Sequence, residues 1–225
     1  MPPAQNKLDA VAAATAAPEG RAVEVGIAAC WSCHGPISDE VLFCPICNAV
    51  QPPGQRDHFR RLGLPVAFDV DKAELDQRYF GLQRRLHPDR FATKSAKEKA
   101  LSQQQATSLN EAYETLHDPL KRAVYMLHIH GVDVLTEGCN QLNDPVVLME
   151  AMEMHEALAA THSVAQASLF AIHTEASIAE CVAGLSVAFR KGDFAEAGTL
   201  TTRLKYLRKL ADETRVHKAR LVLRA

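Results

Sequence analysis

The sequence predicts an all-α protein: a helical hairpin followed by a three-helix bundle, with a small four-cysteine module ahead of both. Three observations support this fold class. Apolar residues recur at helical spacing in successive segments between residues 74 and 211. Proline, glycine and aspartate mark the ends of these segments, as expected at helix termini. Two Cys-x-x-Cys pairs lie close together before the first long helix.

The composition limits the class of protein. The chain has 225 residues, of which 47% are hydrophobic, enough for the core of one large or two modest domains. The formal net charge is -2 and the pI is about 6.5, so no overall basic field indicates a nucleic-acid partner. No apolar run approaches the roughly 18 residues that span a bilayer, so we expect no membrane segment.

Changes in composition divide the chain into four predicted regions. The first is rich in alanine, with scattered proline and no clear period, which is typical of disorder. The cluster Pro52-Pro53-Gly54 then separates the cysteine pairs from the periodic segments. The regions are a disordered tail at residues 1–29, the four-cysteine module at 30–54, the hairpin domain at 55–131 and the bundle at 132–225.

The two Cys-x-x-Cys pairs predict a metal site. Each pair can place two thiolates on the same ion, and four sulfur ligands close a tetrahedral shell that suits zinc. A closed shell leaves no open position for chemistry. We therefore expect one structural zinc ion, which supplies folding energy to a segment too small for a core of its own. The predicted ligands are Cys30, Cys33, Cys44 and Cys47.

Three alternatives use the same cysteines: two disulfides, a redox-active pair, or iron in the same cage. A redox-active pair would need one reactive thiol of low pKa instead of four metal-held thiolates. His34 directly follows Cys33, but with four thiols available we expect it to be a bystander. Cys139 and Cys181 are isolated, and we expect both to be ordinary buried or half-buried thiols.

The tripeptide His87-Pro88-Asp89 lies between two amphipathic segments, residues 74–86 and a second one that ends at residue 116. Proline has no N–H to donate and disfavours a helical conformation at the residue before it, so the first helix should end there. The pattern places a histidine, a rigid proline and an acid at the tip of a helical hairpin. A bare match to three residues is more typical of a surface turn, and the flanking helices argue against that interpretation. Three arginines lie off the apolar stripe of the first helix, namely Arg78, Arg84 and Arg85.

The first helix of the predicted bundle follows Asp144-Pro145 and has two apolar sides. One stripe, sufficient to bury the helix, consists of Val147, Ala151, Met154 and Leu158. The other side carries a second apolar set with two acids close to it: Leu148, Met149 and Met152 with Glu153 and Glu156. Methionine adapts well to partner surfaces, so this side predicts a protein-binding site. The alternatives are a helix buried all round and a dimer seam.

Two further helices complete the bundle. One covers residues 166–191 and ends at Gly192, and the next begins after Asp193. The expected buried stripe of the last helix consists of Leu200, Leu204, Leu207 and Ala211. Tyr206 falls off this stripe and is either a surface aromatic or part of the same partner site.

The His-Pro-Asp tripeptide with its flanking helices resembles the J-domain of DnaJ-type co-chaperones, whose loop stimulates DnaK-type ATPases. Three further segments make the chain, from about residue 56 to its end, similar to the iron–sulfur cluster co-chaperone family HscB, known in mitochondria as Jac1. These segments are Asn110-Glu111-Ala112-Tyr113, Arg122-Ala123-Val124-Tyr125 and Leu148-Met149-Glu150. The cysteine module resembles the amino-terminal extension of animal members, which many bacterial members lack.

The resemblance implies a co-chaperone of iron–sulfur cluster biogenesis that performs no covalent chemistry and is not an enzyme. His87, Pro88 and Asp89 would engage the ATPase domain of a specialised DnaK-type chaperone, HscA, together with Arg78, Arg84 and Arg85. The bundle would bind IscU, the scaffold on which clusters are built. The matching scaffold-binding positions are Leu148, Met149, Met152, Glu153, Glu156 and Tyr206. Tyr206 stands where the family usually has phenylalanine, and Ala160 stands where an acid would extend the patch.

Two other functions can be compared with this one. A zinc-ribbon nucleic-acid binder would need basic residues around the cysteines, and residues 30–47 contain no lysine or arginine. A general J-domain co-chaperone with a different client would share the hairpin and differ in what the bundle binds. For localisation, we expect a bacterial cytoplasm, because residues 1–29 are not the Arg-rich, acid-poor segment of a mitochondrial presequence. The animal-like cysteine module keeps the mitochondrial matrix as the alternative.

Overall fold

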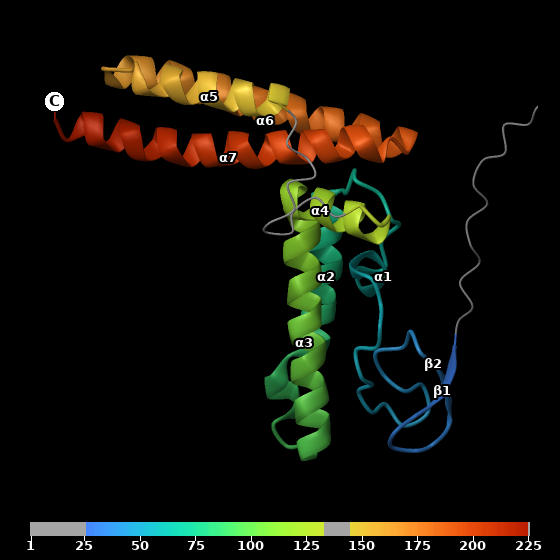
Figure 1. Ribbon diagram of the computed structural model, residues 1–225. Helices are drawn as coiled ribbons and strands as arrows, with labels where there is room; N and C mark the ends of the chain where they lie inside the picture. The colour runs from blue at the N-terminus through green and yellow to red at the C-terminus, as the bar shows by residue number, and fades with distance from the viewer. Residues whose placement is uncertain (1–25, 133–144, 225) are drawn as a thin grey trace, which may run out of the picture.

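The computed structural model describes residues 26–132 and 145–224, and Figure 1 shows their arrangement. The predicted tail lies almost entirely outside the described residues, as do Cys139 and the predicted helix cap Asp144. Within these residues the prediction of an all-α fold is confirmed, with one small strand pair added. The elements are β1 Ile27–Ala29, β2 Pro36–Ser38, α1 His58–Leu62, α2 Lys72–Leu86, a 3₁₀ turn Pro88–Phe91, α3 Ala96–His117, α4 Pro119–Ile129, α5 Pro145–Ala159, α6 Val164–Lys191 and α7 Phe194–Val222.

The two strands belong to the four-cysteine module. They pair antiparallel, with Ala28 opposite Ile37 and the first cysteine pair in the turn between them. The module therefore begins before the predicted boundary at residue 30. Strands this short carry no readable alternation in the sequence, and their pairing follows from the turn that the cysteines form.

Local capping explains where the hairpin helices begin. The Asp71 side chain accepts hydrogen bonds from the backbone N–H groups of Ala73 and Glu74 and so caps α2. Ser95 caps α3 in a reciprocal arrangement with Glu98, in which each side chain bonds the other residue's backbone. Asp118 caps α4, with proline at its first position, as the sequence predicts.

The hairpin of α2 and α3 is held together by the apolar stripes that the sequence predicts. Leu75 and Leu86 of α2 and Leu109 and Leu116 of α3 are almost fully buried. Tyr79 stacks on a tyrosine of α3, with 4.0 Å between the ring centroids. The stripe thus fixes how α2 is rotated, which decides where its C-terminal end points.

The bundle is built from two long antiparallel helices, α6 and α7, with the shorter α5 packed on α7 (Figure 1). Gly192 ends α6 in the left-handed conformation at φ 69°, which costs glycine little, and Asp193 caps α7. Cys181 is buried in α6, and its thiol donates to the Leu200 carbonyl at 3.1 Å. No helix among the described residues is both long and apolar enough to cross a membrane.

The buried side of α7 is broader than the predicted stripe. Leu204 and Leu207 are buried as expected, but Leu210 is buried where the pattern favours Ala211, which is only half-buried. The reason is that α7 contacts α4, α5 and α6, so three neighbours cover a wider arc than one stripe provides.

The hairpin and the bundle share one continuous hydrophobic core, which runs from Val50 through the hairpin to Leu207. At their junction the Arg208 guanidinium binds both carboxylate oxygens of Asp118, at 2.9 and 2.7 Å. Phe68 stacks on Phe189 of α6 with 5.2 Å between ring centroids. Figure 1 shows the consequence: the bundle lies across one end of the upright hairpin, far from its other end.

Candidate functional site

The His-Pro-Asp loop, His87 to Asp89, lies at the end of α2 that is remote from the bundle. His87 leaves the helical conformation, and Pro88 takes the first position of the following 3₁₀ turn. The His87 Nδ1 accepts the backbone N–H of Asp89 at 3.3 Å and lies 3.6 Å from its carboxylate. The imidazole is 54% exposed and the carboxylate 90%, so both groups are available to a partner.

Two buried contacts hold this loop in place. The Ser102 hydroxyl of α3 donates to the Leu86 carbonyl at 2.7 Å, which satisfies a backbone acceptor at the open end of α2. On the other side of the loop, Phe91 is buried in the hairpin core. The exposed tripeptide is therefore fixed at both of its ends, and its side chains need little ordering when a partner binds.

The three arginines predicted to accompany the loop have different surroundings. Arg84 is exposed and donates only to the Phe80 carbonyl of its own helix, at 3.3 Å. Arg78 binds the Glu74 carboxylate through two nitrogens, at 2.9 and 2.7 Å. The Arg85 guanidinium lies 5.0 Å from the Phe43 ring centroid, a cation–π contact with the cysteine module. Of the three, Arg84 alone has a guanidinium with neither a carboxylate nor an aromatic partner.

The second predicted site lies on α5 and is exposed. We call it the methionine face, which consists of Leu148, Met149, Met152, Glu153 and Glu156. Met149 is 62% and Met152 is 65% exposed, whereas Leu148 is half-buried. Both acids are exposed as well. The alternative of a helix buried all round is therefore wrong for α5. The two exposed methionines and the half-buried leucine thus form an apolar patch beside two exposed acids, and its role in binding a partner stays a prediction.

The orientation of this face depends on how α5 is attached to α7. The Glu150 carboxylate accepts two hydrogen bonds from the Arg203 guanidinium, at 2.8 and 2.6 Å. Val147 and Leu158 are buried on the same side of α5. A bidentate pair of this kind fixes direction as well as distance. The methionines consequently point away from α7.

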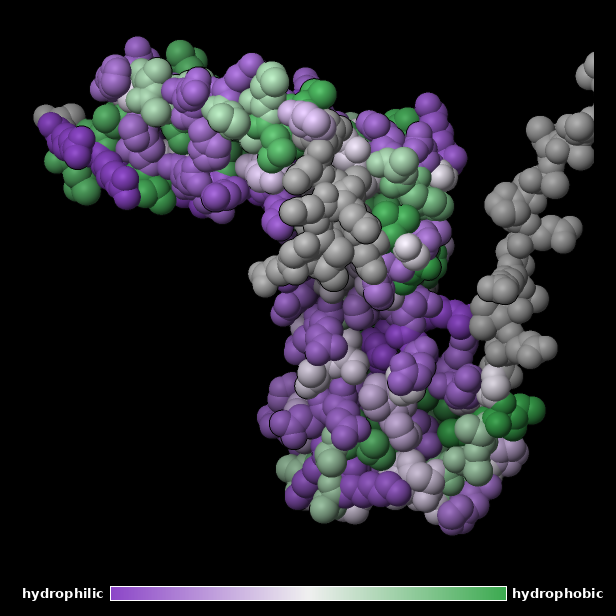
Figure 2. Space-filling view, viewed as in Figure 1, coloured by the Kyte–Doolittle hydropathy of each residue, from purple (hydrophilic) through white to green (hydrophobic). Residues whose placement is uncertain are grey.

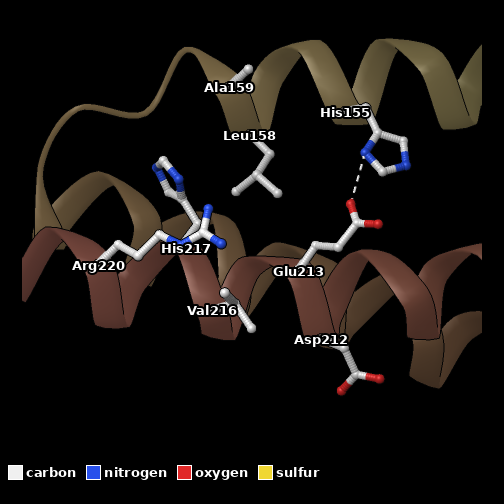
Figure 3. A pocket seen from close by; sticks show the side chains of 8 residues that line it. All are labelled: His155, Leu158, Ala159, Asp212, Glu213, Val216, His217 and Arg220. Carbon is white, nitrogen blue, oxygen red and sulfur yellow. Dashed lines mark ion pairs between the residues drawn. The ribbon is translucent and has the colours of Figure 1, made fainter.

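A cavity of about 470 Å³ opens between the last turns of α5 and the distal half of α7 (Figure 3). His155 of α5 and Glu213 of α7 face each other across its edge, with 3.0 Å between Nδ1 and Oε2. Beyond it, the His217 Nε2 lies 3.0 Å from the Thr161 carbonyl oxygen. The first contact joins α5 to α7, and the second joins α7 to the turn that follows α5. Among the described residues, the one cluster of metal-ligating groups lies elsewhere, in the cysteine module.

Tyr206 is the one predicted scaffold-binding residue that comes from a different helix. It is half-buried in the seam between α5 and α7, where it lines a narrow crevice with Val147, Ala151 and Met154. The structure thus places it behind the stripe that attaches α5, on the side of the helix away from the exposed methionines.

The four cysteines form one cluster, with all four sulfur atoms within 4.8 Å of one another. The Cys30 and Cys47 sulfurs are 3.7 Å apart, as are those of Cys33 and Cys44. Sulfurs bound at about 2.3 Å to one tetrahedral ion lie about 3.8 Å apart, so the set fits a single ion. All four are free thiols, which contradicts the disulfide alternative. The prediction that these four cysteines form one cluster able to hold a metal ion is confirmed, and His34 is not part of the cluster.

The two cysteine pairs have the same backbone structure. The carbonyl oxygen of each first cysteine, Cys30 and Cys44, accepts the N–H four residues later at 2.9 Å. That fourth residue is left-handed in both pairs, His34 at φ 59° and Asn48 at φ 58°. The tight turn lets a backbone N–H reach each first sulfur, from Ser32 and from Ile46, both at 3.4 Å. Such donors stabilise thiolates at a metal site.

The thiols influence one another's ionisation. Burial raises the pKa of Cys30, but hydrogen bonds from the Cys33 and Ser32 backbone and from the other thiols outweigh it and lower the pKa to about 6. A backbone hydrogen bond from Gly35 lowers the pKa of Cys33, while burial and the neighbouring thiols raise it to about 12. Four negative charges cannot gather here at neutral pH without a cation, so metal binding must displace protons.

The hairpin and its loop define the class of protein, and comparison with known proteins supports it. Residues 57–125 match the DnaJ domain family, so this is a J-domain protein. Residues 143–215 match the family described as HSCB C-terminal oligomerisation domain. The combination of a J domain with this second domain is what distinguishes the chain from J-domain proteins in general.

Individual relatives agree with both matches. The human iron–sulfur cluster co-chaperone protein HscB is 36% identical over 193 residues, which is 84% of this chain and 82% of the relative. A Vibrio cholerae HscB homolog is 35% identical over 70% of this chain and 94% of its own. The crystal structure of human HscB superposes with a TM-score of 0.78 at 34% identity, over 85% of this chain and 98% of that one. Yeast Jac1 superposes with a TM-score of 0.56 at 26% identity, over 67% and 86%. The chain belongs to the HscB family of iron–sulfur cluster co-chaperones.

Sequence reasoning missed the residues that position these sites. Ser102 and Arg203 look like ordinary polar positions of a helix, since their partners are a backbone carbonyl and a carboxylate on other helices. For Phe91 the sequence did offer a signal. It is an aromatic side chain two positions after Asp89 in an otherwise polar loop, which favours its burial.

Proposed function

We propose that this protein stimulates ATP hydrolysis by a DnaK-type chaperone similar to HscA and presents to it an IscU-type iron–sulfur scaffold. The observation that carries the first half is the His-Pro-Asp loop, which is exposed yet fixed on both sides by Ser102 and Phe91. The aspartate carboxylate and the exposed Arg84 supply charged groups for the chaperone surface. The protein acts by binding, and no reacting bond lies in its own site.

The methionine face supports the second half of the proposal. It joins apolar side chains that adapt to a partner with two exposed acids that can select a basic rim. Tyr206 supports the face from behind by packing against the seam of α5 and α7. Because the shared core fixes the bundle on the hairpin, a scaffold on α5 and a chaperone on the loop would be held at a constant separation, which raises their effective concentration.

For the cysteine cluster we propose zinc in a structural role. Four thiolates with backbone N–H donors suit a closed tetrahedral zinc shell, and no ligand position is left for a substrate. When bound, the ion would fold a module whose own buried apolar cluster is very small, consisting of Cys30, Ile37 and Cys44.

The substitution His87→Gln tests the chaperone half. It should leave helical content and scaffold binding unchanged and remove stimulation of the ATPase activity of an HscA-like chaperone, measured at steady state with the scaffold present. His173→Gln, at an exposed position of α6, is the matched control and should stimulate normally. Full stimulation by the His87 variant would refute this half of the proposal.

The scaffold half is tested separately by titrating the protein with an IscU-type scaffold and with an unfolded model client. Tight binding of the scaffold alone supports the proposal. Preference for the unfolded client would instead indicate a general J-domain co-chaperone.

Elemental analysis tests the metal. The native protein should contain one zinc per chain, and the Cys30→Ser variant should have lost it. Iron in the native protein would replace zinc in the proposal.

A further inference from the structure

A groove of about 640 Å³ lies between the cysteine module, α1 and α2, on the side of α2 that faces the module. Two half-buried leucines line it, Leu42 of the module and Leu82 of α2, in front of the almost fully buried Leu62 of α1. Figure 2 shows a hollow with strongly hydrophilic walls where the module meets the hairpin. Neither the His-Pro-Asp loop nor the methionine face contributes a residue to this groove, although Arg78 and Arg85, which the resemblance assigns to the chaperone contact, line its α2 side.

The charges that line the groove do not balance. It contains five arginines and two glutamates, namely Arg56, Arg60, Arg61, Arg78 and Arg85 with Glu40 and Glu74. Both glutamates are already engaged, because Glu74 pairs with Arg78 at 2.7 Å and Glu40 pairs with Arg60 at 3.4 Å. The remaining three arginines form no ion pair with a carboxylate among the described residues.

Two of these three guanidinium groups, those of the half-buried Arg56 and the buried Arg61, each have one buried nitrogen without a hydrogen-bond partner. Arg61 is 8% exposed, and its Nη1 has no hydrogen-bond partner. Arg56 donates to the Glu40 carbonyl at 2.8 Å, but its Nη2 is likewise buried and unpartnered. Native proteins leave few buried donors unpaired, so two adjacent ones at a groove require an explanation.

The electrostatic surroundings of Arg56 and Arg61 agree with this geometry. Burial lowers the pKa of both guanidinium groups, and each is faced by acids that oppose the shift without cancelling it. For Arg56 these acids are Glu40 and Asp39. For Arg61 they are Glu111 and Asp57, while Arg56 adds to the lowering. An added carboxylate would relieve the desolvated positive charge and accept the free N–H groups.

We propose that this groove binds an acidic peptide segment of a partner protein, whose carboxylates engage Arg56 and Arg61 while its apolar side chains rest on Leu42 and Leu82. These two leucines favour a peptide over a nucleic acid, whose backbone offers phosphates but no aliphatic side chains. The cysteine module forms one wall, so the site exists only when that module is folded. This inference goes beyond the ATPase stimulation proposed above and does not depend on it.

The test measures fluorescence anisotropy of a short labelled peptide of alternating aspartate and leucine with the full-length protein, in the absence of chaperone and ATP. The same peptide with asparagine in place of aspartate should bind at least about tenfold more weakly. Affinity for the acidic peptide should fall as salt is raised. Equal binding of the two peptides would overturn the proposal, as would stronger binding of a single-stranded oligonucleotide or of inorganic phosphate alone.

Two variants locate the binding in the groove. Arg61→Gln removes one unsatisfied guanidinium and should weaken the acidic peptide by roughly tenfold or more. Gly81 of α2 lines the groove, and a Cβ added there meets no atom within 4 Å, so Gly81→Leu should fill the groove without disturbing the helix. Because leucine favours helix more than glycine does, this variant should be at least as thermostable as the native protein and yet bind the peptide weakly.

Controls separate this proposal from the proposed function. Arg215→Gln makes the same charge change at an exposed position of α7, outside the groove, and should bind the peptide normally. His87→Gln should also bind it normally, because its effect is confined to the loop. If the native protein does not stimulate the chaperone but still binds the peptide, the groove proposal is supported and the chaperone proposal is refuted. If Gly81→Leu and Arg61→Gln both bind like the native protein, the groove is refuted.

Discussion

The His-Pro-Asp loop and the methionine face are both exposed, but they are held in place in different ways. The loop is fixed within the hairpin, by the proline itself, the hydroxyl of Ser102 and the buried ring of Phe91. The methionine face is carried by α5, whose helix contacts in the bundle are mainly with α7 and include the Glu150–Arg203 pair.

This difference determines which substitutions can weaken partner binding at each surface. A loop with a rigid backbone and a buried anchor is disturbed mainly by changes next to it. A surface on a helix attached at one seam can also be disturbed by a residue that never touches the partner. The comparison therefore predicts that remote substitutions will affect scaffold binding more than they affect chaperone stimulation.

The largest effect is expected from Phe91→Ala. Removing a ring that is 7% exposed should cost about 3–5 kcal/mol of stability, concentrated at the end of the hairpin. Stimulation of the chaperone ATPase should be lost, whereas scaffold binding should be retained. Phe80→Ala, at a half-exposed position of the same hairpin, is a control for losing a ring and should cost much less stability. Retained stimulation would show that Phe91 does not anchor the loop.

The next effect is on the methionine face itself. Leu148→Ala with Met149→Ala should weaken scaffold binding by about 1–2 kcal/mol for each side chain, as expected for residues at the centre of an interface. Isothermal titration with the scaffold measures this loss. Val216→Ala, an exposed apolar position of α7, is the matched control, and stimulation of the chaperone without scaffold should not change. Unchanged affinity would remove this face from the scaffold site.

A smaller effect is expected from Arg203→Met, which tests whether a remote contact matters to that face. Methionine keeps the packing of the aliphatic stem but releases Glu150, so α5 should lose about 1 kcal/mol of attachment to α7. Scaffold affinity should fall severalfold, and backbone amides of α5 should exchange faster with solvent. The loop should be unaffected. Equal exchange in α5 of the two proteins would contradict the idea that this pair orients the helix.

The smallest effect concerns the junction between hairpin and bundle. Burial raises the pKa of Asp118, but hydrogen bonds from the Lys121 and Leu120 backbone and the pairing with Arg208 outweigh it, so the pKa lies below its usual range. A carboxyl with a lowered folded-state pKa stabilises the fold above its unfolded pKa of about 3.9. That stabilisation disappears as the pH falls through the folded-state value.

Asp118→Asn keeps a capping side chain and loses the ion pair, so it should cost about 1 kcal/mol or less at neutral pH. Denaturant unfolding as a function of pH checks the sign. The difference between the native protein and the variant should shrink as the solution is acidified below about pH 4. A difference that grows toward acid would mean that Asp118 is not stabilised as a carboxylate.

Much of the fold was predictable because its signals are local. Asp118 and Pro119, Gly192 and the leucine stripe of α2 each act within a turn or two of helix, so the pattern predicts the element directly. The cysteine spacing also predicted the metal cluster, because each pair forms its turn from neighbouring residues. The buried side of α7 was less predictable, since it depends on three helices from elsewhere in the chain.

The sequence by itself therefore determined the helices, their ends, the exposed tripeptide and the set of four thiols, since those features depend on the backbone and on residues close by. Only the tertiary structure decided which arginine of α2 is exposed, which engages Glu74 and which packs on Phe43. It alone placed Arg56 and Arg61 together in a groove with unsatisfied donors. The physical reason is that burial and charge pairing depend on which distant segments meet in the fold, and no local pattern encodes that meeting.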